Sequence, residues 1–264
     1  MDAHPIFGGD PVAATLSSRE ALNPPQSWGL VITGLWPVSG GAGTAGSELT
    51  SQYTALRASL EAASDAWYIY PLPHLHCTLA TLSSFRDGSL AKDAASGTCL
   101  GDGQADQDDD SLEPRRAEAA AIWQAALDRA FAALPPQGKL TMAAPVLKNV
   151  GIFLHDDPDG VVAVIRDAVR IAAADPALEA AGVSIEAPDF AIPSIVHSSF
   201  LRFVRDVSDE DEAARLRDAF ESASAAWQPV EWSLDQVRLV VETVPYMHMP
   251  DAESATAWAW SLDP

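Results

Sequence analysis

Two stretches of the chain decide the fold: "PLPHLHCTLATL" (residues 71–82) and "IPSIVHSSFLRF" (residues 192–203). Each has a proline near its start and is then rich in apolar and β-branched residues, which predicts a strand. Each also carries a histidine, His76 or His197, in the pattern His-x-Thr/Ser-apolar. Two copies of this short pattern, far apart in the chain but each within a predicted strand, are the strongest functional signal in the sequence.

The spacing within each pattern places a hydroxyl beside the imidazole. Side chains alternate between the two faces of a strand, so His76 and Thr78 lie on one face, and His197 and Ser199 share a face in the second strand. The residues between and after them face the other way. We therefore expect two imidazole–hydroxyl pairs, each backed by an apolar side chain in the core.

Two such pairs facing each other suit phosphoester chemistry. Histidine has an ordinary pKa of about 6.5, so one imidazole can accept a proton while the other donates one near neutral pH. The hydroxyls can donate hydrogen bonds to the phosphate oxygens as their negative charge grows. This chemistry needs no metal ion and no other cofactor.

The order of predicted elements repeats around the two histidine strands. Each half of the chain reads as helix, strand, histidine strand, loop, helix and strand, which predicts an α+β fold of two lobes of similar build packed side by side. The short strand "AWYIY" is expected to pair with or lie close to the first histidine strand. The predicted strands are "WGLVITGLW" (28–36), "AWYIY" (66–70), 71–82, 139–154 with a break at Pro145, "VSIEA" (183–187), 192–203 and 236–244.

The predicted helices are marked by apolar residues at helical spacing. One begins near Ser47, one near Pro114, one near Val161, and one after Ser208, which stands three residues before Asp211 as in a capping box. The turn "HDDPDG" contains His155 and precedes the third of these helices.

The domain organisation follows from composition along the chain. Residues 1–27 are rich in Pro, Gly and Ser and read as an N-terminal arm, and residues 28–264 as a single bilobed domain. Within it, residues 87–113 are poor in apolar side chains and end in an acidic run, so we expect a disordered insertion.

Overall charge excludes one class of partner. The chain has 16 Lys and Arg against 37 Asp and Glu, a net charge of −21. A field of this sign opposes long nucleic acids, which bind to basic stripes, whereas a small nucleotide or an RNA end can still bind beside a few arginines. Because there is no secretory signal and no membrane-length apolar run, we expect a cytoplasmic, soluble protein without a membrane partner, and a monomer.

The motifs "HCTL" (76–79) and "HSSF" (197–200) resemble those of the 2H phosphoesterase superfamily, which includes the RNA 2′,3′-cyclic phosphodiesterases. This resemblance implies a bilobed α+β protein of two pseudo-symmetric lobes, with central antiparallel sheets flanked by helices. Both motifs are then expected to lie on central strands and to line one groove. It also implies that His76 and His197 are the general acid and base, without saying which is which, and that Thr78 and Ser199 bind the phosphate. The chain departs from the family pattern in Phe200, in its long acidic insertion and in its length.

Three further residues are candidates for substrate binding. Arg202 resembles a basic residue often found just after the second motif, although simple alternation places it on the far face from His197 unless the strand bulges first. Tyr246, after the last predicted strand, is a candidate for stacking on a base, and Lys148 for holding a phosphate.

Two alternatives stay open beside a metal-independent phosphodiesterase acting on a 2′,3′-cyclic phosphate or a 2′-5′ linkage. His74, His76 and His197, with an acid such as Asp189, have side chains that could ligate zinc in a hydrolase. Alternatively, the same fold binds a nucleotide without turning it over. His155 is expected to have no catalytic role, because it lies in a predicted turn.

Overall fold

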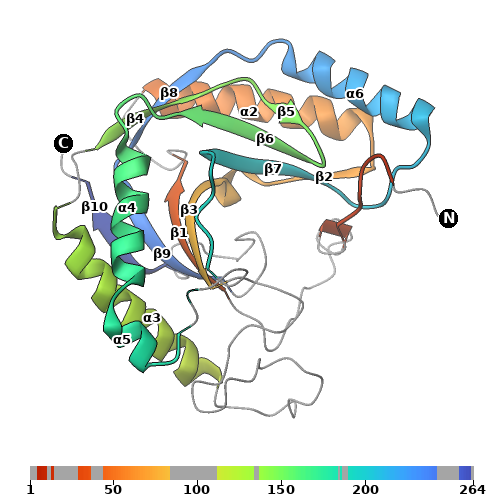
Figure 1. Cartoon of the computed structure of the whole chain (residues 1–264). Helices are drawn as coiled ribbons and strands as arrows, with labels where there is room; N and C mark the ends of the chain where they lie inside the picture. The colour runs from red at the N-terminus through yellow and green to blue at the C-terminus, as the bar shows by residue number, and fades with distance from the viewer. Residues whose placement is uncertain are drawn as a thin grey trace, which may run out of the picture.

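The computed structural model describes residues 5–10, 13–14, 29–36, 44–83, 112–133, 137–183, 185, 190–242 and 256–262. Most of the predicted insertion therefore lies outside the described residues, as do Asp189 and Tyr246. The described part confirms the α+β class: helices flank two curled antiparallel sheets (Figure 1). None of its helices is long and apolar enough to cross a membrane.

The two sheets each contain one of the histidine strands. The four-stranded sheet has the order β10-β9-β1-β3, and the six-stranded sheet contains β2-β7-β6-β4-β8 with β5 paired to β6. The strands of the first sheet are β1 (Gly29–Leu35), β3 (His76–Ser83), β9 (Gln236–Glu242) and β10 (Thr256–Ser261). Those of the second are β2 (Trp67–Ile69), β4 (Gly138–Met142), β5 (Val146–Leu147), β6 (Val150–Asp156), β7 (His197–Phe203) and β8 (Val230–Leu234).

The pairing of β2 differs from the prediction. Its residue Tyr68 stands opposite Arg202 of β7, so β2 extends the sheet of the second histidine strand and does not pair with β3. The 3₁₀ turn Leu72–His74, which follows Pro71, separates β2 from β3 and redirects the chain between the sheets. Conversely, β9 and β10 from the end of the chain complete the sheet of β1 and β3. Each lobe therefore draws strands from both halves of the sequence.

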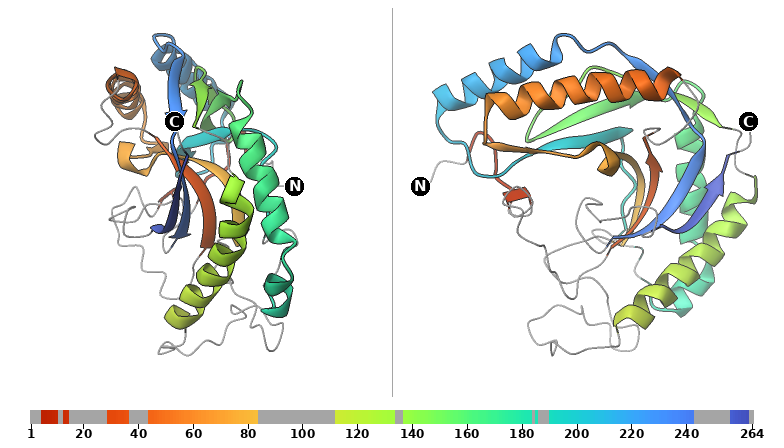
Figure 2. Two further views of the ribbon diagram at one scale, coloured as in Figure 1. Left: turned by 90° about the vertical axis from the view of Figure 1, so that its left-hand side faces the viewer. Right: turned by 180° about the vertical axis from the view of Figure 1, so that it is seen from behind.

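The second sheet is covered on one face by α2 (Thr44–Ala63) and α6 (Glu210–Ser224), which contact each other (Figures 1 and 2). Aromatic rings fill the space between these helices and the sheet. Phe153 lies at the centre of this cluster, with ring centroids 4.6 Å from Phe200 and 5.3 Å from Trp36. This apolar layer makes the helix-covered face the core face of β6 and β7.

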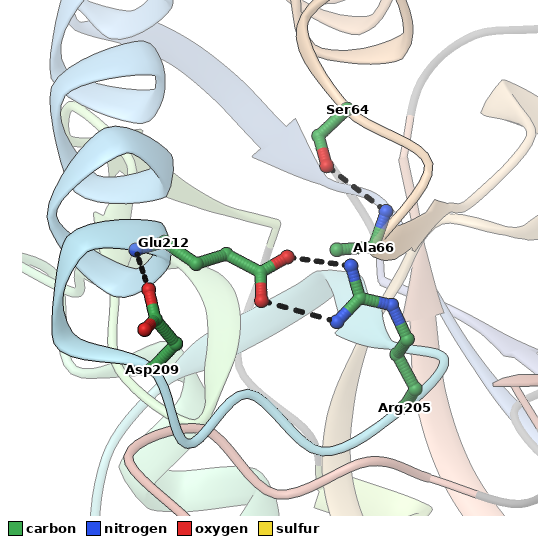
Figure 3. Close-up of polar contacts among 5 residues, drawn as sticks. All are labelled: Ser64, Ala66, Arg205, Asp209 and Glu212. Atoms are coloured by element: carbon green, nitrogen blue, oxygen red, sulfur yellow. Dashed lines mark hydrogen bonds and ion pairs between the residues drawn. The ribbon is translucent and has the colours of Figure 1, made fainter.

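Helix α6 begins one residue later than the capping pattern predicts. The cap is Asp209, not Ser208, and its carboxylate accepts a hydrogen bond of 2.7 Å from the backbone N–H of Glu212 (Figure 3). Glu212 in turn forms a two-bond ion pair with Arg205, which precedes the helix. The acidic first turn is thereby fixed to the end of β7, and negative charge there also favours the helix dipole.

The first sheet is flanked by α3 (Leu112–Ala130), the turn Phe131–Ala133, α4 (Val161–Ala173) and α5 (Pro176–Ala180), as Figures 1 and 2 show. Helix α3 contacts β9, and α4 contacts β3. Trp123 and Leu127 of α3 are fully buried, as their helical spacing predicts. The predicted strand 183–187 is not supported, because Val183 and Ile185, its two described residues, lie outside the strands.

Candidate active site

Strands β3 and β7 bring the two predicted motifs together. The strands contact each other without forming a common hydrogen-bonded ladder, so the two sheets meet where the histidines lie. The imidazoles are close enough that a charge on His197 lowers the pKa of His76. On the opposite strand faces, Leu79 and Phe200 are fully buried in the core, as alternation predicts.

Both strands then break their alternation at the same place. Going along β3, Thr78 pairs with Thr33 of β1 but Ala80 pairs with Ile32, so Leu79 is an extra residue. Two consecutive residues are therefore buried, and the next side chain returns to the face of the histidine. Thr33 itself is fully buried, and no hydrogen-bond partner for its hydroxyl is found within the described ranges.

The equivalent bulge in β7 decides the position of Arg202. Ser199 pairs with Ile152 and Leu201 with Gly151, so Phe200 is left over. Arg202 consequently lies on the same face as His197 and Ser199, not on the far face. Burial is the main cause of the lowered pKa of both His76 and His197, and the positive charge of Arg202 adds to this lowering in both.

Gly151 allows the bulge in β7 to pack closely. A Cβ atom at this position would lie 2.8 Å from the Cβ atom of Leu201 and 3.1 Å from the ring of Phe200. These distances are shorter than an ordinary van der Waals contact, so a side chain at 151 would push the bulged residues away. The glycine therefore helps to hold Arg202 on the histidine face.

The ring of His76 is held by the turn that precedes its strand. Its Nδ1 lies 2.9 Å from the carbonyl oxygen of His74, so Nδ1–H donates this bond and Nε2 carries the lone pair. Burial among the surrounding atoms lowers the pKa of His76 to about 4, and the nearby positive groups add to this effect. His76 is therefore neutral at pH 7 and presents an unprotonated Nε2.

His197 lies in a similar place but is held differently. Burial, and the charges of Arg166 and Arg202, lower its pKa, while the backbone of Ile195 acts in the opposite direction. Ile195 stands two residues before His197, as His74 stands before His76. Here, however, the buried Nδ1 makes no hydrogen bond of proper geometry to any described residue. The second imidazole is thus less firmly fixed than the first.

Arg202 is held by two groups that sequence reasoning missed. Its Nε donates to the hydroxyl of Tyr70 (2.7 Å), and its Nη1 donates to the carboxylate of Asp10 (3.0 Å). Asp10 belongs to the N-terminal segment, whose Phe7 stacks on Phe203 at the end of β7. No periodic pattern marks Asp10, so the sequence carries no signal that the arm reaches the site.

A buried polar network supports β7 from behind. Ser198 Oγ lies 2.9 Å from both Trp36 Nε1 and His155 Nε2. Because Trp232 Nε1 donates to His155 Nδ1 (3.3 Å), the proton of this imidazole is on Nε2, which donates to Ser198. Burial lowers the pKa of His155 to about 3. The prediction of a turn was wrong for His155, which is a buried residue of β6.

Of the remaining candidates, the structure describes Lys148 and His74 but not Tyr246 or Asp189. Lys148 is exposed in the turn between β5 and β6, where its backbone N–H bonds to Val150, and Tyr246 lies outside the described residues. His74 is in the 3₁₀ turn and contributes its backbone carbonyl. Over the ranges that the structure describes, no three His, Cys, Asp or Glu side chains gather as metal ligands. Asp189 of the zinc alternative is outside those ranges.

The comparisons with known proteins give structural matches only. No protein-family model and no curated protein matches the chain. Among solved structures, it is similar to TT0787 of Thermus thermophilus (12% identity, 89% of this chain and 97% of that chain, TM-score 0.45). It is also similar to ATU0111 from Agrobacterium tumefaciens, described as a conserved protein of unknown function (16% identity, 92% and 89% coverage, TM-score 0.46).

Two further matches have functional names. One is a chain described as a phosphoesterase (13% identity, 90% of this chain and 100% of that chain, TM-score 0.44). The other is the PDE domain of MHV ns2 (14% identity, 67% and 84% coverage, TM-score 0.32). The resemblance of this chain to the 2H phosphoesterases rests on its two motifs and on the strands that carry them, and not on these matches.

Proposed function

We propose that the protein is a metal-independent phosphodiesterase that opens a 2′,3′-cyclic phosphate, or cleaves a 2′-5′ linkage, in a small nucleotide or at an RNA end. One observation carries this proposal. The adjoining strands β3 and β7 each present an imidazole with a hydroxyl two residues later, and the bulge in β7 adds Arg202 to the same face. An acid, a base and donors for phosphate oxygens are the groups that this reaction requires.

The hydrogen bond of His76 favours a role for it as the general base. With Nδ1–H donated to the His74 carbonyl, the lone pair on Nε2 can take a proton from the attacking water. The water oxygen bonds to phosphorus, and the bond from phosphorus to one ribose oxygen breaks. His197, protonated at the start, gives its proton to that oxygen. The cycle leaves His76 protonated and His197 neutral, and exchange with solvent restores both.

The polar groups beside the imidazoles suit the charge that develops on the phosphate. The hydroxyls of Thr78 and Ser199 can donate to the non-bridging oxygens, and the guanidinium of Arg202 offers a positive charge that Tyr70 and Asp10 hold in one orientation. Because the chain as a whole carries −21, such a local cation is needed to attract an anionic substrate.

Hydrolysis of 2′,3′-cyclic AMP and of a short 2′-5′ oligoadenylate, both with EDTA present, tests the proposal. We expect turnover by the wild type, and a loss of about 10²–10⁴-fold in His76→Ala and in His197→Ala, the range for general acid–base groups. His74→Ala is the matched control, because it keeps the backbone carbonyl that His76 uses and should stay active.

Each competing function predicts a different result. A zinc hydrolase would lose activity in EDTA, regain it with zinc and be inactivated by His74→Ala. A binding module would be stabilised thermally by the nucleotide and turn over neither substrate. Full activity in His76→Ala or His197→Ala would contradict the assignment of the two histidines.

A further inference from the structure

Arg166 is a buried cation on a helix that is otherwise apolar on its inner face. Its side chain is only 7% exposed. The buried residues Val162 and Val169 stand four positions before it and three after it, so all three lie on the same, inner face of α4. Arg170, one turn later, is exposed and forms an ordinary ion pair with Asp167. The buried position of Arg166 therefore needs an explanation that a surface arginine does not.

The hydrogen bonds of Arg166 join the two histidine strands. Its Nε donates to the carbonyl of Leu79 (3.1 Å), and its Nη2 donates to the carbonyl of Ile195 (2.9 Å). Leu79 is the bulged residue of β3, and Ile195 precedes His197 by two residues. Two carbonyl oxygens cannot bond to each other, whereas the planar guanidinium offers a donor to each.

The hydrogen bonds of Arg166 lie next to the point where backbone pairing between β3 and the segment preceding β7 ends. The segment that leads into β7 pairs with β3 at a single bridge, with N–H···O bonds of 2.8 and 3.0 Å between Thr81 and Ala191. Leu79 is two residues closer to His76 than Thr81 is. Arg166 thus continues the connection from the last backbone bridge toward the histidines.

Within the part of the chain that the structure describes, Arg166 has no ion-pair partner. The nearby carboxylate of Asp157 acts on Arg166 through its charge, while its Oδ2 accepts a hydrogen bond of 3.0 Å from the N–H of Val162 in the first turn of α4. A buried guanidinium that is bonded only to carbonyls keeps its full positive charge beside the site.

We propose that Arg166 is a positioning residue that clamps β3 to the segment preceding β7, so that His76 and His197 contact the same phosphate group. This inference rests on the proposed function, because it assigns the clamp a purpose in that reaction. Lysine cannot replace the clamp, since a single ammonium lacks the rigid fork that spans two carbonyls. If Arg166 is a clamp, Arg166→Lys should change the relative position of the two histidines. If Arg166 only stabilises the fold, Arg166→Lys should leave that position unchanged.

The test follows the imidazole Cε1–H signals of both histidines by NMR during titration with inorganic phosphate, which requires no turnover. In the wild type we expect both signals to respond at one phosphate concentration. In Arg166→Met and Arg166→Lys we expect one of the two signals to lose most of its phosphate-induced shift while the other keeps it, because one imidazole no longer reaches the anion. Arg170→Met, on the same helix, should behave as the wild type.

A pH titration of the same signals separates the charge of Arg166 from its clamp. Among the described residues, the charged and titratable groups that affect His197 or are affected by it are His76, His155, Arg166, Arg202 and the thiol of Cys77, which lies against the backbone of His197. Arg166→Met removes a cation and should raise the pKa of His197, whereas Arg166→Lys should leave that pKa near its wild-type value.

Kinetics complete the test. We expect Arg166→Lys to lower kcat about 10²-fold with little change in KM, as for a misplaced reacting group. Wild-type phosphate responses and wild-type kcat in Arg166→Lys, with only a lower melting temperature, would overturn the clamp. If the wild type turns over neither substrate while phosphate still moves both signals together, the proposed function fails but the clamp stands.

Discussion

Strands β3 and β7 follow one design but are supported differently. Each carries a histidine, a hydroxyl two residues later and a bulge after that. Strand β3, however, lies at the edge of its sheet, whereas β7 lies between β2 and β6. The edge strand has its imidazole fixed by the turn before it, and the central strand has an arginine after its bulge. The shared pattern supplies the proposed acid, base and hydroxyl donors, and the different supports give the two imidazoles different properties.

The side chains behind the two motifs differ in the same way. Cys77, between His76 and Thr78, is buried and its pKa is raised by burial to about 12, so it acts as a small apolar group. Ser198, at the equivalent place in β7, accepts hydrogen bonds from Trp36 and His155. A polar network thus specifies the position of β7, whereas β3 relies on apolar packing and on the clamp by Arg166.

Replacing either histidine should have the largest effect on kcat/KM. The two replacements should change the pH dependence of kcat/KM in different ways. We expect kcat/KM of the wild type to rise as His76 loses its proton near pH 4 and to fall as His197 loses its proton, at a pH below 6.5 because its pKa is lowered. Residual activity of His76→Ala should lack the rising limb, and that of His197→Ala the falling limb. Loss of the same limb in both variants would show that the two imidazoles are not base and acid.

The next largest effect on kcat/KM is expected at Arg202, the residue after the bulge in β7. Its counterpart in β3, Thr81, should matter much less. Arg202→Met removes a charge and its hydrogen bonds, worth about 1.5–3 kcal/mol, so kcat/KM should fall roughly ten- to a hundredfold. Thr81→Val changes the equivalent residue of β3 and should leave kcat/KM within about threefold, because Thr81 uses its backbone to pair with Ala191. Steady-state kinetics on 2′,3′-cyclic AMP measure both, and equal losses would mean that the bulges serve the fold alone.

The smallest effects are expected for Ser198 and Cys77, which lie on the core side of the two motifs. Replacing them should change the free energy of unfolding. Ser198→Ala leaves two buried N–H donors without their acceptor and should lower the free energy of unfolding by about 1–3 kcal/mol. Cys77→Ala removes one atom from an apolar site and should cost about 1 kcal/mol. Urea unfolding with a common m-value measures the difference. An equal cost in both variants would show that the network behind β7 contributes no specific stabilisation.

Local pattern predicted which side chains of the two histidine strands are buried better than it predicted the pairing of strands. Alternation within β3 and β7 correctly assigns Leu79 and Phe200 to the core, and adjacent apolar pairs such as Phe200–Leu201 are in retrospect the signal of the bulge. The sequence could not show that β2 pairs with β7, because pairing between distant segments leaves no trace in local periodicity. The turn after Pro71 redirects the chain there.

Residues that support the site were harder to predict than those that form it. Arg166 occupies a helix position that favours an apolar residue, and a charged side chain there is normally assigned to the surface. Asp10 lies in a segment without periodicity, and His155 was assigned to a turn because acidic and turn-forming residues follow it. In each case the deciding partner lies far away in sequence, and the side chain gains its role only when the sheets meet.

The exchange of strands between the lobes constrains how the chain can be made. Strand β1, near the start, has β3 on one side and β9, about two hundred residues later, on the other, with β10 beyond it. A growing chain on the ribosome cannot complete either sheet from its first half. The edge of β1 that pairs with β9 must therefore wait for its partner until about two hundred further residues have been synthesised.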